Sequence, residues 1–331
     1  MAIALHSCGP MGNLAEADLS ATELPDGIVW IDMLAPTADE TAFVARTTGL
    51  NVASRDELSE IETSSRLRAE KGVLYLSMPA VFRRDGVPFT TPLGFVLSAN
   101  HLITIRFEEL PAFKTFKSEI GLEQNVHPSS AGAFAGLLET MVDRMADVLE
   151  HVGAELDIIS HGVFRAKEMR AAAKGSRKTQ EMAQLDRLRT VGRMGDLISK
   201  IRDSLLGIGR IVPFAAGRCP DWMPQEVKLE LETLKQDVLS LNDYDGYLSG
   251  KVQFLLDATL GLINIEQNNI IKVLAVATVV SLVPTFIASW YGMNFKIIPE
   301  YDWELGYPYV IAITVASAVL PLVWFRWKRW F

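Results

Sequence analysis

A short polar segment near the end of the chain has the residue types expected for contact with an ion. This segment is Tyr291-Gly292-Met293-Asn294-Phe295, and it ends the first of two uncharged apolar runs. The first run covers residues 273–295, and the second covers residues 306–325. Because about 20 apolar helical residues cross the hydrocarbon core of a membrane, each run is long enough to span it. A polar tripeptide at the exit of the first span favours ion passage over soluble enzymology.

The rest of the chain lacks the patterns that enzymes and nucleotide-driven pumps require. It has no Gly-x-Ser-x-Gly, Cys-x-x-Cys or His-Glu-x-x-His pattern, no P-loop and no Gly-rich dinucleotide motif. Cys8 and Cys219 are far apart, and the five histidines show no ligand spacing, so we expect neither a disulfide scaffold nor a histidine-built zinc site. Residues 1–11 also lack the basic start and apolar core of a signal peptide. We therefore expect no enzyme, no cofactor and no nucleic-acid partner.

Charge around the two apolar runs predicts their orientation. Basic residues mark the cytoplasmic side of a membrane, and they stand before the first run and after the second. The connecting loop is acidic, and Trp and Tyr cluster at both boundaries as in aromatic belts. We expect two spans in the bacterial inner membrane, with both termini in the cytoplasm; a buried hairpin of a soluble protein is the alternative. The basic residues are Lys272, Arg326, Lys328 and Arg329, and the loop carboxylates are Glu300, Asp302 and Glu304.

The region before the spans divides into an α/β domain and a helical domain. Strands are predicted at residues 28–33, 73–82, 90–98 and 101–107, a helix begins at residues 36–40, and Arg83–Gly86 forms a turn. Helices are predicted from about Ser129 and over residues 178–211, where Pro213 and later prolines should end the second one. The expected boundaries are 1–125 for the α/β domain, 126–270 for the long-helix stalk, 271–292 and 308–326 for the spans, 293–307 for the external loop and 327–331 for the basic tail.

A third long helix is predicted from about Pro224 to Tyr291, because no break separates it from the first span. At 1.5 Å per residue it would be roughly 100 Å long. Its apolar residues follow a heptad-like seam typical of coiled coils, which Asp245 and Thr259 weaken. So long a helix needs partners, and a two-span protomer cannot enclose a pore, so we expect a symmetric oligomer. The seam residues are Val227, Leu231, Leu234, Val238, Leu241, Leu248, Val252, Leu255 and Leu262.

These features together resemble the CorA family of magnesium transporters over nearly the whole chain. The resemblance implies a homopentameric funnel with one pore on the five-fold axis. Its protomer would have an α+β cytosolic domain, long coiled-coil stalk helices and a C-terminal two-helix transmembrane hairpin. The zinc-transporting ZntB branch is similar, but its motif usually departs at the middle residue, whereas Met293 is retained here. The residues that carry the resemblance are 291–295, Asn268–Leu274, Pro284–Phe286, Ile298–Glu300, Gly306–Pro308, the tail, Trp30–Asp32 and Ser64–Arg66.

The resemblance implies a selectivity filter made by Gly292, Met293 and Asn294. Mg²⁺ holds its water tightly, and five Asn294 carbonyl oxygens can accept hydrogen bonds from those waters without stripping them. Gly292 would permit the tight turn out of the helix, and Met293 would pack behind it; a plain asparagine helix cap is the alternative. The family's other axis positions, all on one helical face, fall on Thr285, Leu282, Thr278, Leu274, Ile271 and Asn268.

The implied function is passive, gated influx of hydrated Mg²⁺, with Co²⁺ and Ni²⁺ as further candidate ions. Leu282, Leu274 and Ile271 would form apolar rings that gate by dewetting, unless they only pack or face lipid. Loop carboxylates would concentrate cations at the mouth, unless they only keep the loop soluble. A divalent cation gains about 4.6 kcal/mol from 100 mV, so no nucleotide is needed. Proton-coupled Zn²⁺ transport of the ZntB type and a non-transporting scaffold are the competing functions.

Two further sets of residues concern regulation. Cytosolic Mg²⁺ is expected to close the pore by bridging subunits, with Asp85, Glu230, Glu232 and Asp257 as candidate ligands. A basic collar beneath the bilayer is expected to contact anionic lipid, although a solvated helix pair is an equally simple interpretation. The collar consists of Lys174, Arg177, Lys178, Arg326, Lys328 and Arg329.

Overall fold

The computed structural model describes most of the chain, in two compact units. The described residues are 3–7, 14–16, 23–60, 62, 66–119, 129–170, 177–218, 221–294 and 298–328. The first unit is Met1–Leu255 and the second is Leu256–Phe331. Helix α7 (Gln225–Tyr291) contributes to both units. Each unit is described below by itself.

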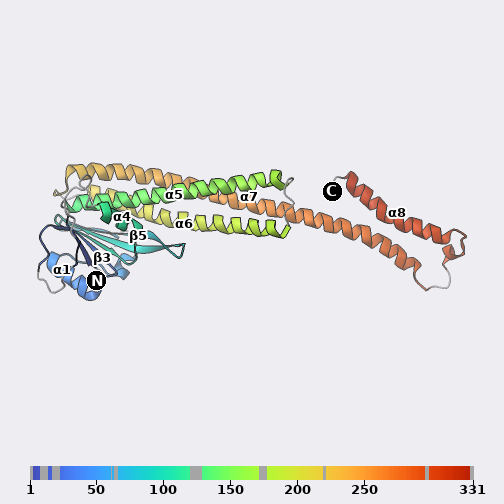
Figure 1. Cartoon of the computed structure of the whole chain (residues 1–331), viewed down its shortest axis with the longest axis horizontal. Helices are drawn as coiled ribbons and strands as arrows, with labels where there is room; N and C mark the ends of the chain where they lie inside the picture. Colours follow the sequence, from blue (N-terminus) through green and yellow to red (C-terminus); the bar gives the residue numbers. More distant parts are fainter. Residues whose placement is uncertain are drawn as a thin grey trace. The chain divides into compact units, whose positions relative to one another are not determined.

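A sheet forms the N-terminal part of the first unit (Figure 1). Its described strands have the order β2-β1-β3-β7-β6-β5-β4, and β3 pairs with β7 in parallel while the other pairs are antiparallel. The strands are β1 (Ile3–Ser7), β2 (Leu14–Glu16), β3 (Ile28–Leu34), β4 (Leu67–Glu70), β5 (Val73–Arg84), β6 (Val87–Leu97) and β7 (Leu102–Arg106). The four strands expected from the sequence are therefore present, with β5 and β6 longer than expected.

The long β5–β6 hairpin follows from its turn residues. Asp85 and Gly86 have φ values of 53° and 78°, and Arg84 pairs directly with Val87. Two successive residues with positive φ make the type I′ turn, whose twist matches that of the strands. The turn predicted at residues 83–86 is thus confirmed, and its two-residue length lets pairing continue to the tip.

Helices cover both faces of the sheet. On one face, α1 (Ala38–Thr48) and α2 (Arg55–Leu58) bury a core that includes Ile31, Met33 and Ile105. The helix start expected at residues 36–40 is a capping box between Thr37 and Glu40. On the other face lie α4 (Pro111–Glu119), α5 (Ser130–Arg170) and α6 (Arg177–Gly217). Gly207 lets α6 approach β5 closely, because a Cβ there would lie 2.7 Å from the Met78 Cβ.

Three long helices, α5, α6 and the first part of α7, run side by side (Figure 1). Helix α6 is antiparallel to α7, since Gly195 lies against Val252 while Gly209 lies against Val238. Helix α7 has 67 residues, which corresponds to roughly 100 Å at 1.5 Å per residue. The uninterrupted helix predicted from Pro224 to Tyr291 is confirmed.

The end predicted for the second long helix is wrong. Helix α6 passes through Pro213 and ends at Gly217. A proline removes one backbone hydrogen bond to the residue four positions earlier, but it does not prevent later ones. The Arg218 amide still donates to the Phe214 carbonyl at 2.9 Å. Ile211, Val212 and Ala215 are fully buried, so packing holds this last turn in place.

The heptad-like seam of α7 is buried inside its own chain. Val227, Leu231, Leu248 and Leu255 are fully buried in the first unit, where α5 and α6 pack against α7. Asp245 on the seam is also buried and accepts a hydrogen bond from the Arg202 Nε at 2.6 Å. The seam therefore has intramolecular partners and does not by itself require a second copy of the chain. Other apolar side chains of α7 remain exposed in this unit, namely Leu239, Tyr247 and Phe254.

The second unit contains the end of α7, the short 3₁₀ helix η1 (Pro299–Asp302) and α8 (Gly306–Trp327). Helices α7 and α8 are both long and apolar enough to cross a membrane. Most of their apolar side chains in this unit are exposed, including Leu274, Leu282 and Leu320. Such exposure is expected of helices whose surroundings are lipid or other copies of the chain.

Candidate ion pathway

The polar tripeptide stands directly at the end of α7. The helix ends at Tyr291, and the Gly292 amide still donates to the Ala288 carbonyl at 3.0 Å. Gly292 is not among the described glycines with positive φ, so the chain leaves the helix without a left-handed residue. A Cβ at this position would lie 3.1 Å from the Ala288 carbonyl oxygen, which is tighter than an ordinary contact. Glycine therefore suits the position because of the space available.

The Asn294 side chain is exposed and makes no hydrogen bond with the described residues. Its backbone is also absent from the described residues with positive φ. An asparagine that caps a helix C-terminus usually takes a left-handed conformation. Neither feature of a cap is found at Asn294, so its amide is available to a ligand.

Hydroxyl side chains lie on α7 in the turns before the tripeptide. Thr285 Oγ1 donates to the Ser281 carbonyl at 2.7 Å, and Thr278 Oγ1 donates to the Leu274 carbonyl at 2.9 Å. Ser281 Oγ donates in the same way to the Ala277 carbonyl at 2.6 Å. Because each proton is used within the helix, the hydroxyl oxygens are left as acceptors. A hydrated cation presents water hydrogens, so these oxygens have the polarity that its water shell needs.

Ser281 was not among the residues expected from the sequence. It lies four residues before Thr285 and three after Thr278, so it occupies the same helical face. That spacing is the signal that could have identified it.

The apolar positions of this face are open in one chain. Leu282 and Leu274 are each 65% exposed, and Ile271 is 62% exposed. Thr285, Thr278 and Asn268 are exposed as well. Helix α7 passes through Pro284, which removes the backbone hydrogen bond to the carbonyl of Val280. The six expected pore-lining residues thus form one unoccupied face of a continuous helix.

The described part of the loop directly before α8 is compact. Gly306 begins α8 and is buried. A Cβ at this position would collide with the Glu300 carbonyl oxygen, so the close approach requires glycine. The Trp303 ring contacts the Tyr309 ring at a centroid distance of 5.8 Å. Asp302 and Glu304 are exposed and Glu300 is half-buried, and none forms an ion pair with a described residue. The three carboxyl groups therefore lie beside the start of α8 without an ion-pair partner among the described residues.

The predicted regulatory acids do not form a metal site among the described residues of one chain. Asp85 is at the tip of the β5–β6 hairpin, about 43 Å along the strand from Gly72 at 3.3 Å per residue. The Gly72 carbonyl accepts from Trp222 Nε1, just before α7, and Glu230 follows in an early turn of α7. Glu232 pairs with Lys235, and Asp257 is exposed. Within the described ranges, no three acidic, histidine or cysteine side chains gather closely enough to hold a metal ion.

Glu230 instead faces other carboxylates of its own chain. It lines a cavity of about 130 Å³ between α5 and α7, together with Glu139 and Asp237. Burial, followed by the charges of Asp143, Glu230 and Asp237, raises the pKa of Glu139. This repulsion was not expected from the sequence, since Glu139 and Glu230 are about ninety residues apart in the chain.

Part of the basic collar is outside the described residues. Lys174 and Arg329 are not described, and Arg177 and Lys178 begin α6 with side chains that are not described either. Arg326 is in the last turn of α8, and Lys328 Nζ lies 5.9 Å from the Trp327 ring centroid. The collar therefore stays a prediction.

Known proteins resemble this chain over almost its full length. Magnesium transport protein CorA of Haemophilus influenzae is 31% identical over 318 residues, covering 96% of each chain. Magnesium transport protein CorA of Escherichia coli K12 is 30% identical over 303 residues, covering 91% of this chain and 92% of the relative. The complete structure of the CorA magnesium transporter from Methanocaldococcus jannaschii matches with a TM-score of 0.77 at 18% identity, over 100% of this chain and 99% of the other.

The structural match shows a shared fold, in which a soluble domain is followed by two C-terminal apolar helices. The family model described as CorA-like Mg²⁺ transporter protein matches residues 25–329. This family consists of transporters and not of enzymes. The chain therefore belongs to the CorA-like Mg²⁺ transporter family.

Proposed function

We propose that five copies of this chain form a gated pathway that admits hydrated Mg²⁺ under the membrane potential. The observation that carries the proposal is Asn294, an exposed side chain without a hydrogen bond to the described residues, at the end of a membrane-length helix. Mg²⁺ sheds its water reluctantly, and an amide oxygen can accept from that water without a fixed charge that would trap the ion. The relatives named as magnesium transport proteins support this choice of ion.

The interior of the pathway would alternate acceptor and apolar rings. Thr285, Ser281 and Thr278 would accept hydrogen bonds from the waters of the ion, because their protons are donated within the helix. Leu282, Leu274 and Ile271 would close the pathway by excluding water when their rings narrow. A divalent ion gains about 4.6 kcal/mol from 100 mV, which is sufficient for passive influx.

The assembly and topology belong to the same proposal. Helix α7 leaves Leu239, Tyr247 and Phe254 exposed in the first unit, and neighbouring copies would bury them around a five-fold axis. The boundaries expected from the sequence place the spans at 271–292 and 308–326. Both termini would be cytoplasmic in the bacterial inner membrane, with Glu300, Asp302 and Glu304 outside.

The test is ion uptake into liposomes by wild type and Asn294→Ala, measured for Mg²⁺, Co²⁺, Ni²⁺ and Zn²⁺ with and without a pH gradient. We expect Asn294→Ala to lose selective Mg²⁺ uptake while the oligomer stays intact in size-exclusion chromatography. Asn242→Ala is the matched control, because the Asn242 amide donates only to the Val238 carbonyl of its own helix. Wild-type Mg²⁺ flux through Asn294→Ala would overturn the proposed filter. Flux that requires a pH gradient and prefers Zn²⁺ would favour the ZntB-type alternative.

Regulation by internal Mg²⁺ would then occur between chains. Asp85 is far along β5 from the start of α7, so it could meet Glu230 or Glu232 only on a neighbouring copy. Asp257 is the fourth candidate ligand. Currents should fall as internal Mg²⁺ rises through the millimolar range, and Asp85→Asn should weaken that response. Currents that ignore internal Mg²⁺ would reject this part of the proposal.

A further inference from the structure

The first unit contains a partly open cavity of about 210 Å³ that has no part in the proposed ion pathway. It lies between the second half of β5, the start of α4, and helices α5 and α6. Its walls are mainly apolar, and they include two methionines whose flexible thioethers adapt to the shape of a ligand. The apolar lining includes Phe82, Leu110, Met141, Met145, Val148 and Ile201.

Two arginines line this cavity without a carboxylate partner among the described residues. They are Arg83 on β5 and Arg144 on α5, and both are exposed. The neighbouring carboxylates are already engaged, because Glu108 pairs with Arg84 at 2.6 Å and Glu109 pairs with Arg106 at 3.3 Å. An apolar cavity that carries two free guanidinium groups is complementary to a molecule with an apolar body and a negative end.

The start of α4 adds to this preference. Leu110, Pro111 and Ala112 line the cavity, and the positive end of the helix dipole lies there. Ser204 of α6 contributes a buried hydroxyl whose bond to the Lys200 carbonyl is long, at 3.4 Å. A hydroxyl bonded so weakly can still hydrogen-bond to a ligand.

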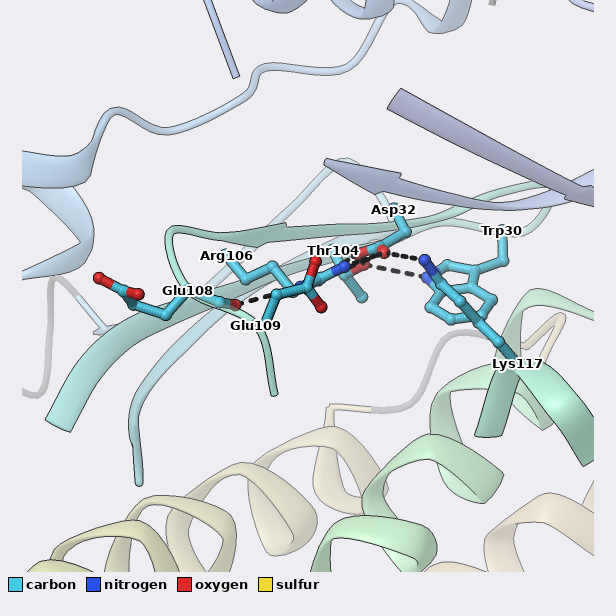
Figure 2. Close-up of polar contacts among 7 residues, drawn as sticks. All are labelled: Trp30, Asp32, Thr104, Arg106, Glu108, Glu109 and Lys117. Carbon is cyan, nitrogen blue, oxygen red and sulfur yellow. Dashed lines mark hydrogen bonds and ion pairs between the residues drawn. The ribbon is translucent and has the colours of Figure 1, made fainter. Parts of the chain in front are cut away.

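A buried ion cluster fixes the α4 wall of the cavity (Figure 2). Asp32 on β3 accepts from Arg106 Nη2 at 2.9 Å and from Lys117 Nζ of α4 at 2.7 Å. Arg106 Nη1 extends to Glu109, which is itself a cavity residue. Because these contacts tie both ends of α4 to the sheet, the wall is in place before any ligand arrives, and little ordering is needed on binding.

We propose that this cavity binds a small amphipathic carboxylate, with the aliphatic chain inside and the carboxylate at Arg83 and Arg144. The volume corresponds to about seven water molecules at 30 Å³ each, so the ligand is shorter than a membrane lipid chain. A bound chain would contact the β5–β6 hairpin, α4, α5 and α6 at once, and would therefore hold the sheet against the long helices.

The test is isothermal titration calorimetry of the full chain in lipid nanodiscs with octanoate as the probe, after subtraction of empty nanodiscs. Octylammonium and 1-octanol are the matched ligands, since they keep the chain but carry positive or no charge. We expect octanoate to bind at least about tenfold more tightly than either. The double variant Arg83→Gln/Arg144→Gln should weaken octanoate by about tenfold or more, since charged hydrogen bonds are lost.

Arg210→Gln removes one exposed charge from α6 away from the cavity, and it should leave octanoate affinity unchanged. Ala80→Ile fills the cavity from β5 and should abolish binding of all three ligands, while the two arginine substitutions leave the apolar wall intact. No octanoate heat with wild type, equal affinity for octylammonium, or an unchanged affinity in the double arginine variant would each overturn the proposal.

Discussion

Replacing Asp32 with Asn should destabilise the first unit severely. The Asp32 carboxylate is 1% exposed and accepts hydrogen bonds from Thr104, Arg106 and Lys117 (Figure 2). Lys117 is 23% exposed and can turn toward water when the carboxylate charge is removed. The Arg106 side chain is 4% exposed and cannot turn toward water. Its remaining partners are the Glu108 carbonyl and the Glu109 carboxylate, and Glu109 is 76% exposed. The variant would therefore bury a poorly compensated guanidinium group.

The expected loss of folding stability follows from the burial of the Asp32–Arg106 ion pair. Removing one partner of a buried ion pair costs about 3–5 kcal/mol, because the other charge stays buried. At about 2–4 °C per kcal/mol for a unit of this size, the apparent unfolding temperature should fall by roughly 6–20 °C. An exposed carboxylate provides the control: Asp26→Asn should shift the temperature by less than about 2 °C.

The pH dependence of the same variant gives a second measurement. Burial alone would raise the pKa of Asp32, but hydrogen bonds and charge from Arg106, with help from Lys117, hold that pKa below its ordinary value of 3.8. A lowered carboxyl pKa stabilises the folded state above pH 3.8, and this contribution is lost as the pH falls through the folded pKa. The gap between wild type and Asp32→Asn should therefore be widest near neutral pH and narrow below about pH 4.

Thermal unfolding of the detergent-solubilised full chain, followed by circular dichroism between pH 3 and pH 8, measures both quantities. The reasoning is refuted if Asp32→Asn unfolds within about 2 °C of Asp26→Asn at pH 7. A gap that stays constant down to pH 3 would equally show that the ionised carboxylate is not the stabilising group.

Three further predictions concern other parts of the chain. His6 is buried against Trp30, and burial, with the charge of Lys117, lowers its pKa from 6.5 to about 4, so folding stability should fall as the pH drops from 6.5 toward 4. His6→Phe should remove that share of the acid sensitivity in unfolding-temperature profiles, and an unchanged slope would contradict it. Gly306→Ala should displace the loop and reduce Mg²⁺ uptake into liposomes, because the added Cβ would collide with the Glu300 carbonyl. Gly192→Ala is the control that should keep uptake, because a Cβ at Gly192 meets open space. Equal uptake by both variants would argue against the clash. Reversing Lys174, Arg177 and Lys178 to Glu should change the dependence of transport on anionic lipid, by about 1 kcal/mol per charge, while Mg²⁺ preference stays the same. Transport rates that match wild type in vesicles with and without anionic lipid would disprove the collar.

Much of the fold follows from local patterns that the chain carries in a single stretch. Strands β3, β5, β6 and β7 were expected because β-branched and aromatic residues stand between turn residues. The uninterrupted α7 was expected because no proline or other clear break separates its stalk part from its apolar part. The tripeptide at residues 292–294 needed only its own residues and its place after an apolar run. Each of these features is fixed by neighbours in sequence.

Other elements were missed because their signals are weak or non-local. Strands β1, β2 and β4 have five, three and four residues, and they exist by pairing with longer strands. Helix α4 was also not expected, although Pro111 at its first position and the apolar pair Phe113 and Phe116 were visible signals. The extension of α6 past Pro213 depends on burial, which overrides the local preference of a proline.

The sequence by itself determined the two helices that are long and apolar enough to cross a membrane, the asparagine that follows the first of them and the continuous helix that leads to it, because composition and period act over a few turns. Only the tertiary structure decided that the α7 seam packs on α5 and α6 of the same chain. It also brought Asp32 beside Arg106, 74 residues away, through the parallel pairing of β3 with β7. The cavity with Arg83 and Arg144 arose in the same way, because it lies where a hairpin and three helices meet. Contacts between distant segments depend on strand register and helix packing, and no local pattern of residues specifies these.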